Sequence, residues 1–399
     1  MTHYITVLGS TGSIGKNTLD VLARHPGRWQ VFALSAATQV DALLAQCAAF
    51  VPRYAVMASA PHARELAEKI KANGLQTEVL QGDDALETIA SHPQVDAVMG
   101  AIVGAAGLGP CLAAARAGKR LLLANKEALV VGGEVFMAAV REGGATLLPI
   151  DSEHSAIFQS LPEDPSTWAR RVQHVLLTAS GGPFRTRDPE TLRNVTPGEA
   201  CAHPNFSMGR KISVDSATMM NKALEVIEAR WLFDLTPEKI KVVIHPQQII
   251  HSMVQFIDAS IVAQLGTPDM RVPIACGLAW PERVASGAAP LDFTQLAALT
   301  FEEADARRFP GLHLSWQALA AAPGTTAVLN ASNEIAVAAF LEGRIRFDQI
   351  HAVNLATLET VVPRGADSLG ALLELDAEAR SAAAQQARHL TAGIAAPCC

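Results

Sequence analysis

The first 150 residues alternate short apolar runs with helical patterns, and this order limits the fold more than any other feature. Runs such as YITVLG, WQVFALSA and YAVMAS are typical of strands, and a stretch with helical spacing of apolar residues follows each of them. Strands that alternate with helices usually pair in parallel, with helices covering the sheet. We therefore expect an N-terminal doubly wound, Rossmann-like α/β domain.

The pattern changes after Asp151. The strand-like runs VQHVLLTASGG, KVVIHP, SMVQFID and SIVAQLG lie closer together, with one long helical pattern near Met219–Phe233. This order predicts a central α+β domain on a mixed sheet. After about residue 301 the chain becomes Ala-rich and helical in pattern, which predicts a C-terminal helical domain.

Composition narrows the function classes. Hydrophobic residues make up 49% of the 399 residues and the formal net charge is −7, with no basic run, so nucleic acid is not an expected partner. Because MTHYITVLGS leads directly into a strand-like run, we expect no signal peptide, and no apolar run is long enough to cross a membrane. Six cysteines lack zinc-ligand spacing. These features predict a cytoplasmic protein without a membrane partner.

The segment VLGSTGSIG has glycines at Gly9, Gly12 and Gly15, after a predicted strand and before a predicted helix. Glycines let the backbone approach a pyrophosphate, and a helix N-terminus attracts its charge. The motif predicts a dinucleotide site with backbone contacts from the four residues Thr11, Gly12, Ser13 and Ile14. The alternative is an ordinary tight turn between a strand and a helix.

The second strand ends without the acidic residue that an NAD site expects at this place. The segment ALSAATQ, residues 33–39, contains no Asp or Glu, which favours the 2′-phosphate of NADP. Ser35, Thr38 and Gln39 could donate hydrogen bonds to that phosphate.

A further predicted strand ends at Ala124. The residues that follow it, Asn125, Lys126 and Glu127, would lie at the edge of the sheet where ligands bind. The alternative is an ordinary helix start with an exposed Lys.

The segment LLPIDSEHSAIFQ places two carboxylates where an apolar strand stops. On an extended chain, Asp151 and Glu153 would point to the same side and repel each other unless a cation lay between them. A third carboxylate, Glu225, lies in a predicted helix, four residues after Asn221 and three after Lys222. Asn221, Lys222 and Glu225 can therefore lie on one face of that helix. Three carboxylates without a designated His or Cys predict one hard divalent cation, Mg²⁺ or Mn²⁺. The alternative for the helix is a solvated charged face.

Several further polar residues suit a phosphate group: the hydroxyls of Ser180 and Ser216, the amide of Asn221 and the charge of Lys222. His203, in the segment HPNFSMG, could close on such a ligand, although a lone His is more often a surface residue.

Together these motifs resemble the 1-deoxy-D-xylulose 5-phosphate reductoisomerase family. The resemblance rests on GSTGSIG, AIVGAAGL, LLANKEAL, PIDSEHSAIFQSL, SGGPFR, HPNFSMGRKISVDSATMMNKALEVIEARWLF, IHPQ, QLGTPDMR and NEIAVAAFL, in register from Ile5 to about Phe347. It implies an NADPH-binding domain over 1–150, a catalytic domain over 151–285 with a flexible lid at about 180–210, a linker over 286–311, a helical domain over 312–399, and a homodimer.

The resemblance also implies roles for individual residues. Asp151, Glu153 and Glu225 would bind the metal and, with Lys126, form the catalytic group. The sugar phosphate substrate would contact Lys126, Ser152, Glu153, Ser180, His203, Ser216, Asn221, Lys222 and Glu225. NADPH would contact Thr11, Gly12, Ser13, Ile14, Ala37, Gln39, Asn125, Glu127 and Gly209.

The implied reaction breaks and re-forms a carbon–carbon bond of 1-deoxy-D-xylulose 5-phosphate and then reduces the aldehyde to 2-C-methyl-D-erythritol 4-phosphate. The chain departs from the family at Ala37–Gln39, where a basic triplet is usual, and at Phe206, where the lid usually has Trp. Two other classes of protein share part of this pattern. A semialdehyde or homoserine dehydrogenase could begin similarly, but the former needs a nucleophilic Cys, and a non-enzymatic NADPH sensor would not need the three carboxylates.

Overall fold

A computed structural model describes residues 2–205, 208–296 and 298–394. The chain divides into two compact units. The first contains residues 1–128, 134–158 and 267–291, and the second contains 129–133, 159–266 and 292–399. The predicted four-part division with boundaries at 150, 285 and 311 stays a prediction.

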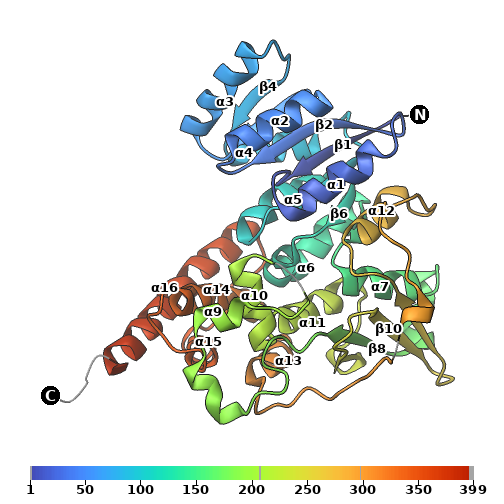
Figure 1. Ribbon diagram of the computed structural model, residues 1–399. Helices are drawn as coiled ribbons and strands as arrows, with labels where there is room; N and C mark the ends of the chain where they lie inside the picture. The colour runs from blue at the N-terminus through green and yellow to red at the C-terminus, as the bar shows by residue number, and fades with distance from the viewer. Residues whose placement is uncertain (1, 206–207, 297, 395–399) are drawn as a thin grey trace. The chain divides into compact units, whose positions relative to one another are not determined.

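The first unit is built on a seven-stranded sheet in the order β4-β3-β2-β1-β5-β6-β7, and every pair is parallel (Figure 1). The strands are β1 (His3–Leu8), β2 (Trp29–Ala36), β3 (Tyr54–Met57), β4 (Glu78–Gln81), β5 (Ala97–Gly100), β6 (Arg120–Leu123) and β7 (Thr146–Pro149). The helices are α1 (Ser13–Ala23), α2 (Val40–Phe50), α3 (Ala60–Ala72), α4 (Asp83–Ser91), α5 (Leu108–Arg116), α6 (Lys126–Gly143), α7 (Ser152–Ser160) and α12 (Arg271–Ala279). The predicted doubly wound α/β fold is confirmed.

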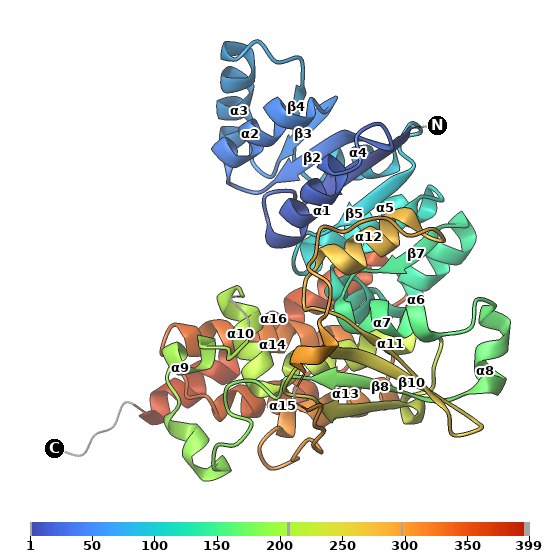
Figure 2. The same cartoon turned by 45° about the vertical axis from the view of Figure 1, so that its right-hand side comes forward.

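The strand order reverses at β1, which has β2 on one side and β5 on the other. In sheets of this kind, ligands bind outside the carboxyl ends of the strands at such a switch point. Buried side chains of β1, β2, β3 and β5 form the core with α1, α2, α3 and α12. Helix α12 follows the second unit's sheet in sequence, yet it lies beside α1 (Figures 1 and 2), where Arg271 pairs with Asp20 at 3.1 Å.

The second unit contains a four-stranded mixed sheet in the order β11-β10-β8-β9, as the sequence predicted. Strands β8 and β9 are parallel, and β10 is antiparallel to both of its neighbours. The strands are β8 (Val172–Ala179), β9 (Ile240–Ile244), β10 (Ile250–Phe256) and β11 (Ile261–Leu265). The helices are α8 (Trp168–Arg171), α9 (Pro197–Cys201), α10 (Arg210–Thr218), α11 (Met220–Leu232), α13 (Leu314–Ala320), α14 (Thr325–Leu341), α15 (Gln349–Thr360) and α16 (Leu369–Ile394).

The C-terminal region is helical, as expected, and α14, α15 and α16 pack together (Figure 2). The stretch predicted to be an irregular lid contains a 3₁₀ turn at Pro189–Asn194 and the short helix α9, so it is partly ordered by local structure. Phe206 lies outside the described residues, as do Cys398 and Cys399.

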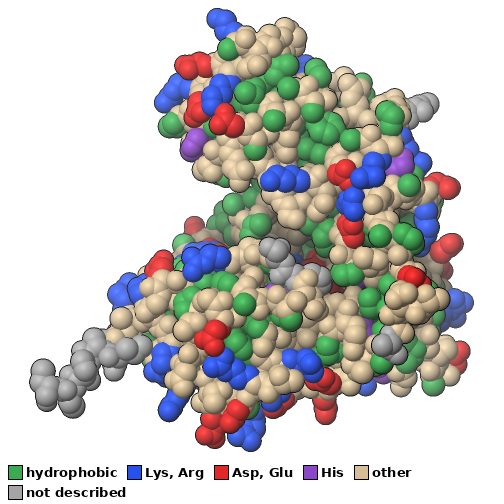
Figure 3. Space-filling view, viewed as in Figure 1, with side chains coloured by type: hydrophobic (Ala, Val, Ile, Leu, Met, Phe, Trp, Pro, Cys, Tyr) green, Lys and Arg blue, Asp and Glu red, His purple; other side chains and the backbone are tan. Residues whose placement is uncertain are grey.

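The surface carries charges of both signs. On the face shown in Figure 3, Lys and Arg side chains are interspersed with Asp and Glu side chains over the described residues. No helix in the described part of the chain combines the length and the apolar composition that a membrane span requires.

Candidate active site

The glycine turn between β1 and α1 is built to approach an anion. Gly9 has φ +76°, and a Cβ atom there would lie 2.6 Å from the carbonyl oxygen of Ala101, which follows β5. Gly12 is the N-cap of α1, and α1 has neither a side-chain cap nor an acidic residue in its first turn. Its first N–H groups and its positive dipole end are therefore suited to a pyrophosphate. Thr11 is buried, whereas Ser13 is exposed.

Gly15→Ala should damage this turn severely. A Cβ atom at Gly15 would lie 2.4 Å from Cα of Ser10 and 2.5 Å from the carbonyl oxygen of Gly9, and these backbone atoms cannot rotate away. We expect the free energy of unfolding to fall by about 1–3 kcal/mol, measured by denaturant titration. Gly12→Ala is the matched control, because its Cβ approaches the same carbonyl oxygen only to 3.4 Å. Gly12→Ala should keep the wild-type free energy of unfolding yet bind the dinucleotide more weakly. Equal free energies of unfolding for the two variants would contradict this interpretation.

The end of β2 lacks a carboxylate, as the sequence indicated. Ala37, Thr38 and Gln39 are exposed there, and the next acid, Asp41, forms an ion pair of 2.6 Å with Lys69. The expectation that Ser35 faces a cofactor phosphate is wrong. Ser35 is 2% exposed, and its Oγ accepts a hydrogen bond from the Gly9 N–H at 2.9 Å, so its hydroxyl helps to hold the glycine turn.

Asn125 closes the start of α6 after β6. Its Oδ1 accepts a hydrogen bond from the Ala128 N–H at 3.1 Å, and its Nδ2 donates to the Gly104 carbonyl at 3.0 Å. Asn125 is 2% exposed and Glu127 is 6% exposed. The N-cap therefore accounts for the Asn at this position, in addition to any cofactor contact.

Asp151 and Glu153 do not lie on one extended segment, so the expected i, i+2 geometry is wrong. The strand β7 ends at Pro149, and Glu153 belongs to the first turn of α7. An acidic residue is favourable there because it faces the positive end of the helix dipole. The Ser152 Oγ–H donates to Glu153 Oε2 at 2.5 Å.

Lys126 pairs with Asp151, with 2.6 Å between Nζ and Oδ2, and both side chains are largely buried. Burial raises the pKa of the Asp151 carboxyl, but the charges of Lys126 and His154, together with side-chain hydrogen bonding to Glu153 and Lys126, outweigh that effect. The resulting pKa lies well below the usual range, so Asp151 is ionised at neutral pH. Sequence reasoning did not single out His154, although its i+3 spacing from Asp151 in the same motif was an available signal.

Helix α11 brings Asn221, Lys222 and Glu225 together on one face, as the spacing predicted. Asn221 Nδ2 donates to Glu225 Oε1, and Lys222 Nζ forms an ion pair with Glu225 Oε2. Lys222 is 2% exposed and Glu225 is 1% exposed. The alternative of a solvated charged face is therefore excluded for these residues.

Ser180 and His203 are hydrogen-bonded to each other in the second unit, with Oγ and Nε2 2.9 Å apart. The Asn205 N–H donates to His203 Nδ1 at 3.1 Å, so Nε2 carries the proton and donates to Ser180. Burial lowers the pKa of His203, which favours this neutral form. The Gly182 N–H also donates to Ser180 Oγ. The Ser180 hydroxyl proton can then serve a ligand oxygen such as that of a phosphate.

The short helix α10 carries the remaining predicted residues of the second unit. Gly209 is its exposed N-cap, and Ser216 is in its last turn. Met219, with φ +62°, then turns the chain into α11. A single left-handed residue therefore joins α10, the helix that carries Ser216, to α11.

The fold and the glycine turn define an α/β protein of the dinucleotide-binding class. Three family models match the chain. They are described as 1-deoxy-D-xylulose 5-phosphate reductoisomerase over residues 5–133, its C-terminal domain over 147–233, and DXP reductoisomerase C-terminal domain over 265–382. The chain belongs to the 1-deoxy-D-xylulose 5-phosphate reductoisomerase family.

Relatives and solved structures agree with this assignment. A 1-deoxy-D-xylulose 5-phosphate reductoisomerase of Cupriavidus taiwanensis is 60% identical over 381 residues, which cover 96% of this chain and 97% of the relative. A crystal structure of DOX-P reductoisomerase in complex with NADPH, fosmidomycin and magnesium is 43% identical, with a TM-score of 0.93 over 97% of this chain and 99% of its own. The Zymomonas mobilis reductoisomerase in complex with NADPH is 45% identical, with a TM-score of 0.92 over 98% of this chain and 100% of its own.

Proposed function

We propose that the chain converts 1-deoxy-D-xylulose 5-phosphate into 2-C-methyl-D-erythritol 4-phosphate with NADPH and one divalent cation, as a step of the non-mevalonate isoprenoid pathway. The observation that carries this proposal is the likeness, over 97% of the chain, to the reductoisomerase solved with NADPH, fosmidomycin and magnesium. The reaction rearranges the carbon skeleton and then reduces an aldehyde. NADPH supplies the hydride for that reduction.

NADPH is proposed to bind at the carboxyl ends of the first unit's strands. The N-terminus of α1, where Gly12 and Ser13 are exposed, suits the pyrophosphate, with backbone contacts proposed from Thr11, Gly12, Ser13 and Ile14. The exposed residues Ala37 and Gln39 would border the adenosine ribose. Asn125, Glu127 and Gly209 are assigned to the cofactor by family resemblance alone.

The substrate's phosphate is proposed to contact Ser180, Ser216, Asn221 and Lys222. In support, the Ser180 hydroxyl has a proton to donate, and Lys222 and Asn221 bring positive charge and an amide to one helix face. Ser152, His203 and the carboxylates would surround the rest of the sugar. We further propose that the segment at about 180–210 closes over the substrate and excludes water.

Asp151, Glu153 and Glu225 are proposed to hold the cation, Mg²⁺ or Mn²⁺. The donor chemistry fits, because all three offer carboxylate oxygens, which hard divalent cations prefer. Asp151 is held ionised and is therefore ready to ligate. The bound cation would act as a Lewis acid on adjacent oxygens of the ketose phosphate.

Lys126 and Glu153 are proposed to assist proton transfer. The Lys126 ammonium is already oriented by Asp151, and the Glu153 carboxyl is oriented by Ser152. Each therefore has a fixed direction before the substrate binds, which lowers the ordering cost of a proton transfer.

The test is NADPH oxidation by the purified chain with 1-deoxy-D-xylulose 5-phosphate as substrate, with product identification by mass spectrometry. We expect activity that requires Mg²⁺ or Mn²⁺ and that disappears on chelation. Metal-independent oxidation, or oxidation with a semialdehyde in place of the ketose phosphate, would reject the proposed reaction.

Cofactor choice is a further prediction. Because no carboxylate lies at the end of β2, kcat/KM should be higher with NADPH than with NADH, and the absence of a basic residue near Thr38 should keep the preference modest. Thr38→Lys should strengthen the preference by a charge-assisted contact, whereas Thr38→Asp should shift it towards NADH. A wild-type preference for NADH would contradict the prediction.

We propose that the protein is a homodimer and that β11 forms part of the interface. Strand β11 is at the edge of its sheet, and Ile261 and Val262 are 52% and 45% exposed there. An apolar edge strand is a ready site for a second copy of the chain. Light scattering should show a dimer for the wild type and a monomer for Ile261→Lys. Val362→Lys is the control, because Val362 is 65% exposed but lies outside β11, and this variant should remain a dimer. A dimeric Ile261→Lys would reject this interface.

A cytoplasmic location is also proposed. The four described cysteines, Cys47, Cys111, Cys201 and Cys276, are free. Free thiols are the usual state in a reducing compartment.

A further inference from the structure

The helix that carries Ser216 has little apolar surface to fix its orientation. α10 contains nine residues, and its only buried aliphatic side chains are Val214 and Ala217. Its C-terminus meets α11 through the left-handed residue Met219. A polar anchor would therefore have a large influence on where the Ser216 hydroxyl points.

Asp215, next to Ser216, is such an anchor. Its side chain is almost fully buried, and Oδ1 accepts a hydrogen bond from Asn333 Nδ2 on α14 at 2.8 Å. Oδ2 forms an ion pair with Lys211 Nζ on the same helix, also at 2.8 Å. Of these two contacts, only the hydrogen bond to Asn333 connects Asp215 to another helix.

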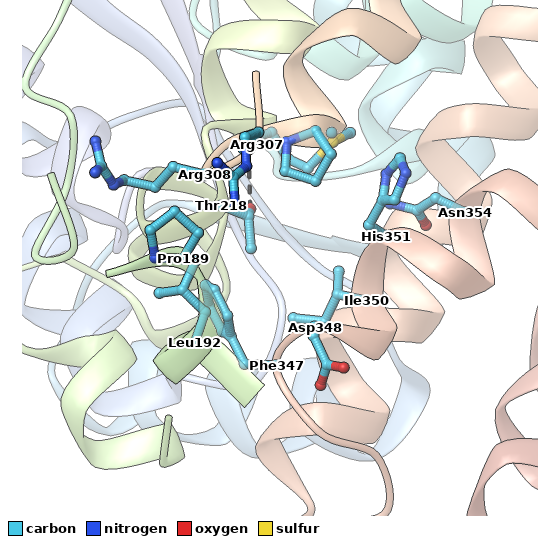
Figure 4. Close-up of a pocket in the computed structure, with 13 residues that line it drawn as sticks. Pro189, Leu192, Thr218, Arg307, Arg308, Phe347, Asp348, Ile350, His351 and Asn354 are labelled. Carbon is cyan, nitrogen blue, oxygen red and sulfur yellow. Dashed lines mark hydrogen bonds between the residues drawn. The ribbon is translucent and has the colours of Figure 1, made fainter. Parts of the chain in front are cut away.

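Asn333 is itself fixed by a second amide. It is fully buried, and its Oδ1 accepts a hydrogen bond from Asn354 Nδ2 on α15 at 3.2 Å. Since a carboxylate only accepts, Asn333 must turn its NH₂ group towards Asp215 and its oxygen towards Asn354. Asn354 lines a pocket of about 120 Å³ beside His351 and Ile350 (Figure 4), where the network ends.

We propose that Asn333 is a positioning residue for the substrate site: by holding Asp215, it sets the direction of Ser216 relative to Asn221 and Lys222. This rests on the proposed contact of Ser216 with the substrate's phosphate. Successive residues on a helix are about 100° apart, so any rotation of α10 that moves Asp215 turns Ser216 by the same angle. The C-terminal helices thereby act on substrate binding without touching the substrate.

The test compares Asn333→Ala with Asn330→Ala. Asn330 is also fully buried on α14, one turn earlier, and its Nδ2 donates to Glu334 at 3.1 Å rather than to α10. Both variants should lower the melting temperature. Only Asn333→Ala should raise KM for the ketose phosphate, by roughly tenfold, as expected for a lost hydrogen bond to a charged group. KM for NADPH should stay unchanged in both.

An exchange of the two residues provides a rescue. Asp215→Asn and Asn333→Asp should each raise KM for the ketose phosphate. The double variant restores a donor opposite a carboxylate with the same total charge, so its KM should return to within about threefold of the wild type. Equal KM changes in the two alanine variants, or a double variant no better than the worse single one, would overturn the positioning role. A wild-type chain inactive on the ketose phosphate would instead overturn the proposed reaction and this role with it.

Discussion

Asp151→Asn is expected to lower turnover by roughly 100-fold or more while the protein keeps its fold. The substitution preserves size and leaves an oxygen that can accept from Lys126, but it removes the ionised ligand. Metal affinity should fall, because each charged oxygen helps to hold a hard cation. Binding of NADPH should change little, since its proposed contacts lie on the Gly12 turn. Turnover, isothermal titration with Mn²⁺ and NADPH fluorescence measure the three effects.

Asp269→Asn is a matched control for this variant. The Asp269 side chain is 19% exposed and forms an ion pair of 2.6 Å with Arg271. The Asp151 side chain is 17% exposed and forms an ion pair of the same length with Lys126. It should affect stability to a similar extent and leave metal affinity and turnover intact. If Asp151 and Glu153 only repelled each other without a cation, Asp151→Asn would stabilise the protein and spare catalysis. Near-normal turnover would therefore exclude the proposed metal site.

Lys222→Met should cause the largest loss of stability. Lys222 and Glu225 are 2% and 1% exposed, so the substitution removes the Lys222 ammonium from its pair with a buried carboxylate. Breaking a buried pair in this way costs about 3–5 kcal/mol. If Glu225 is a metal ligand, Mg²⁺ should restore part of the loss by binding to the native state. Denaturant unfolding with EDTA and with Mg²⁺ separates the two contributions.

Two further variants define the origin of that loss. Lys222→Met combined with Glu225→Gln removes both charges and should be more stable than Lys222→Met alone. Arg230→Met changes a residue of the same helix and breaks its pair with Asp234, which follows α11 and is 96% exposed at its side chain, so it should cost less than about 1 kcal/mol. A Lys222→Met protein that gains no more stability from Mg²⁺ than Arg230→Met would argue against Glu225 as a ligand.

Local sequence order was enough to predict the parts of the protein that short-range geometry determines. The alternation of strands and helices predicted the parallel sheet, and the spacing of Gly9, Gly12 and Gly15 predicted the turn at its switch point. The i+3 and i+4 spacings from Lys222 and Asn221 to Glu225 predicted their shared helix face, because helical periodicity fixes such neighbours.

The failures concern element boundaries and distant partners. The expected extended segment at Asp151 and Glu153 is wrong, because periodicity does not show that α7 begins at Ser152, directly after Asp151. The expected contact of Ser35 with the cofactor is wrong, because its actual partner, Gly9, lies 26 positions away in the sequence and local patterns do not show that pairing. The pairing of Asp215 with Asn333 spans 118 positions, and a single sequence carries no signal for it. Packing of the whole chain decides such contacts.

The most direct test of the metal assignment is the anomalous diffraction of crystals grown with Mn²⁺. We predict one strong peak per chain, within direct ligand distance of carboxylate oxygens of Asp151, Glu153 and Glu225. The same crystals soaked with EDTA should lose the peak. A single Mn²⁺ bound by other residues, or an active crystal form with no peak at these carboxylates, would contradict the proposed site.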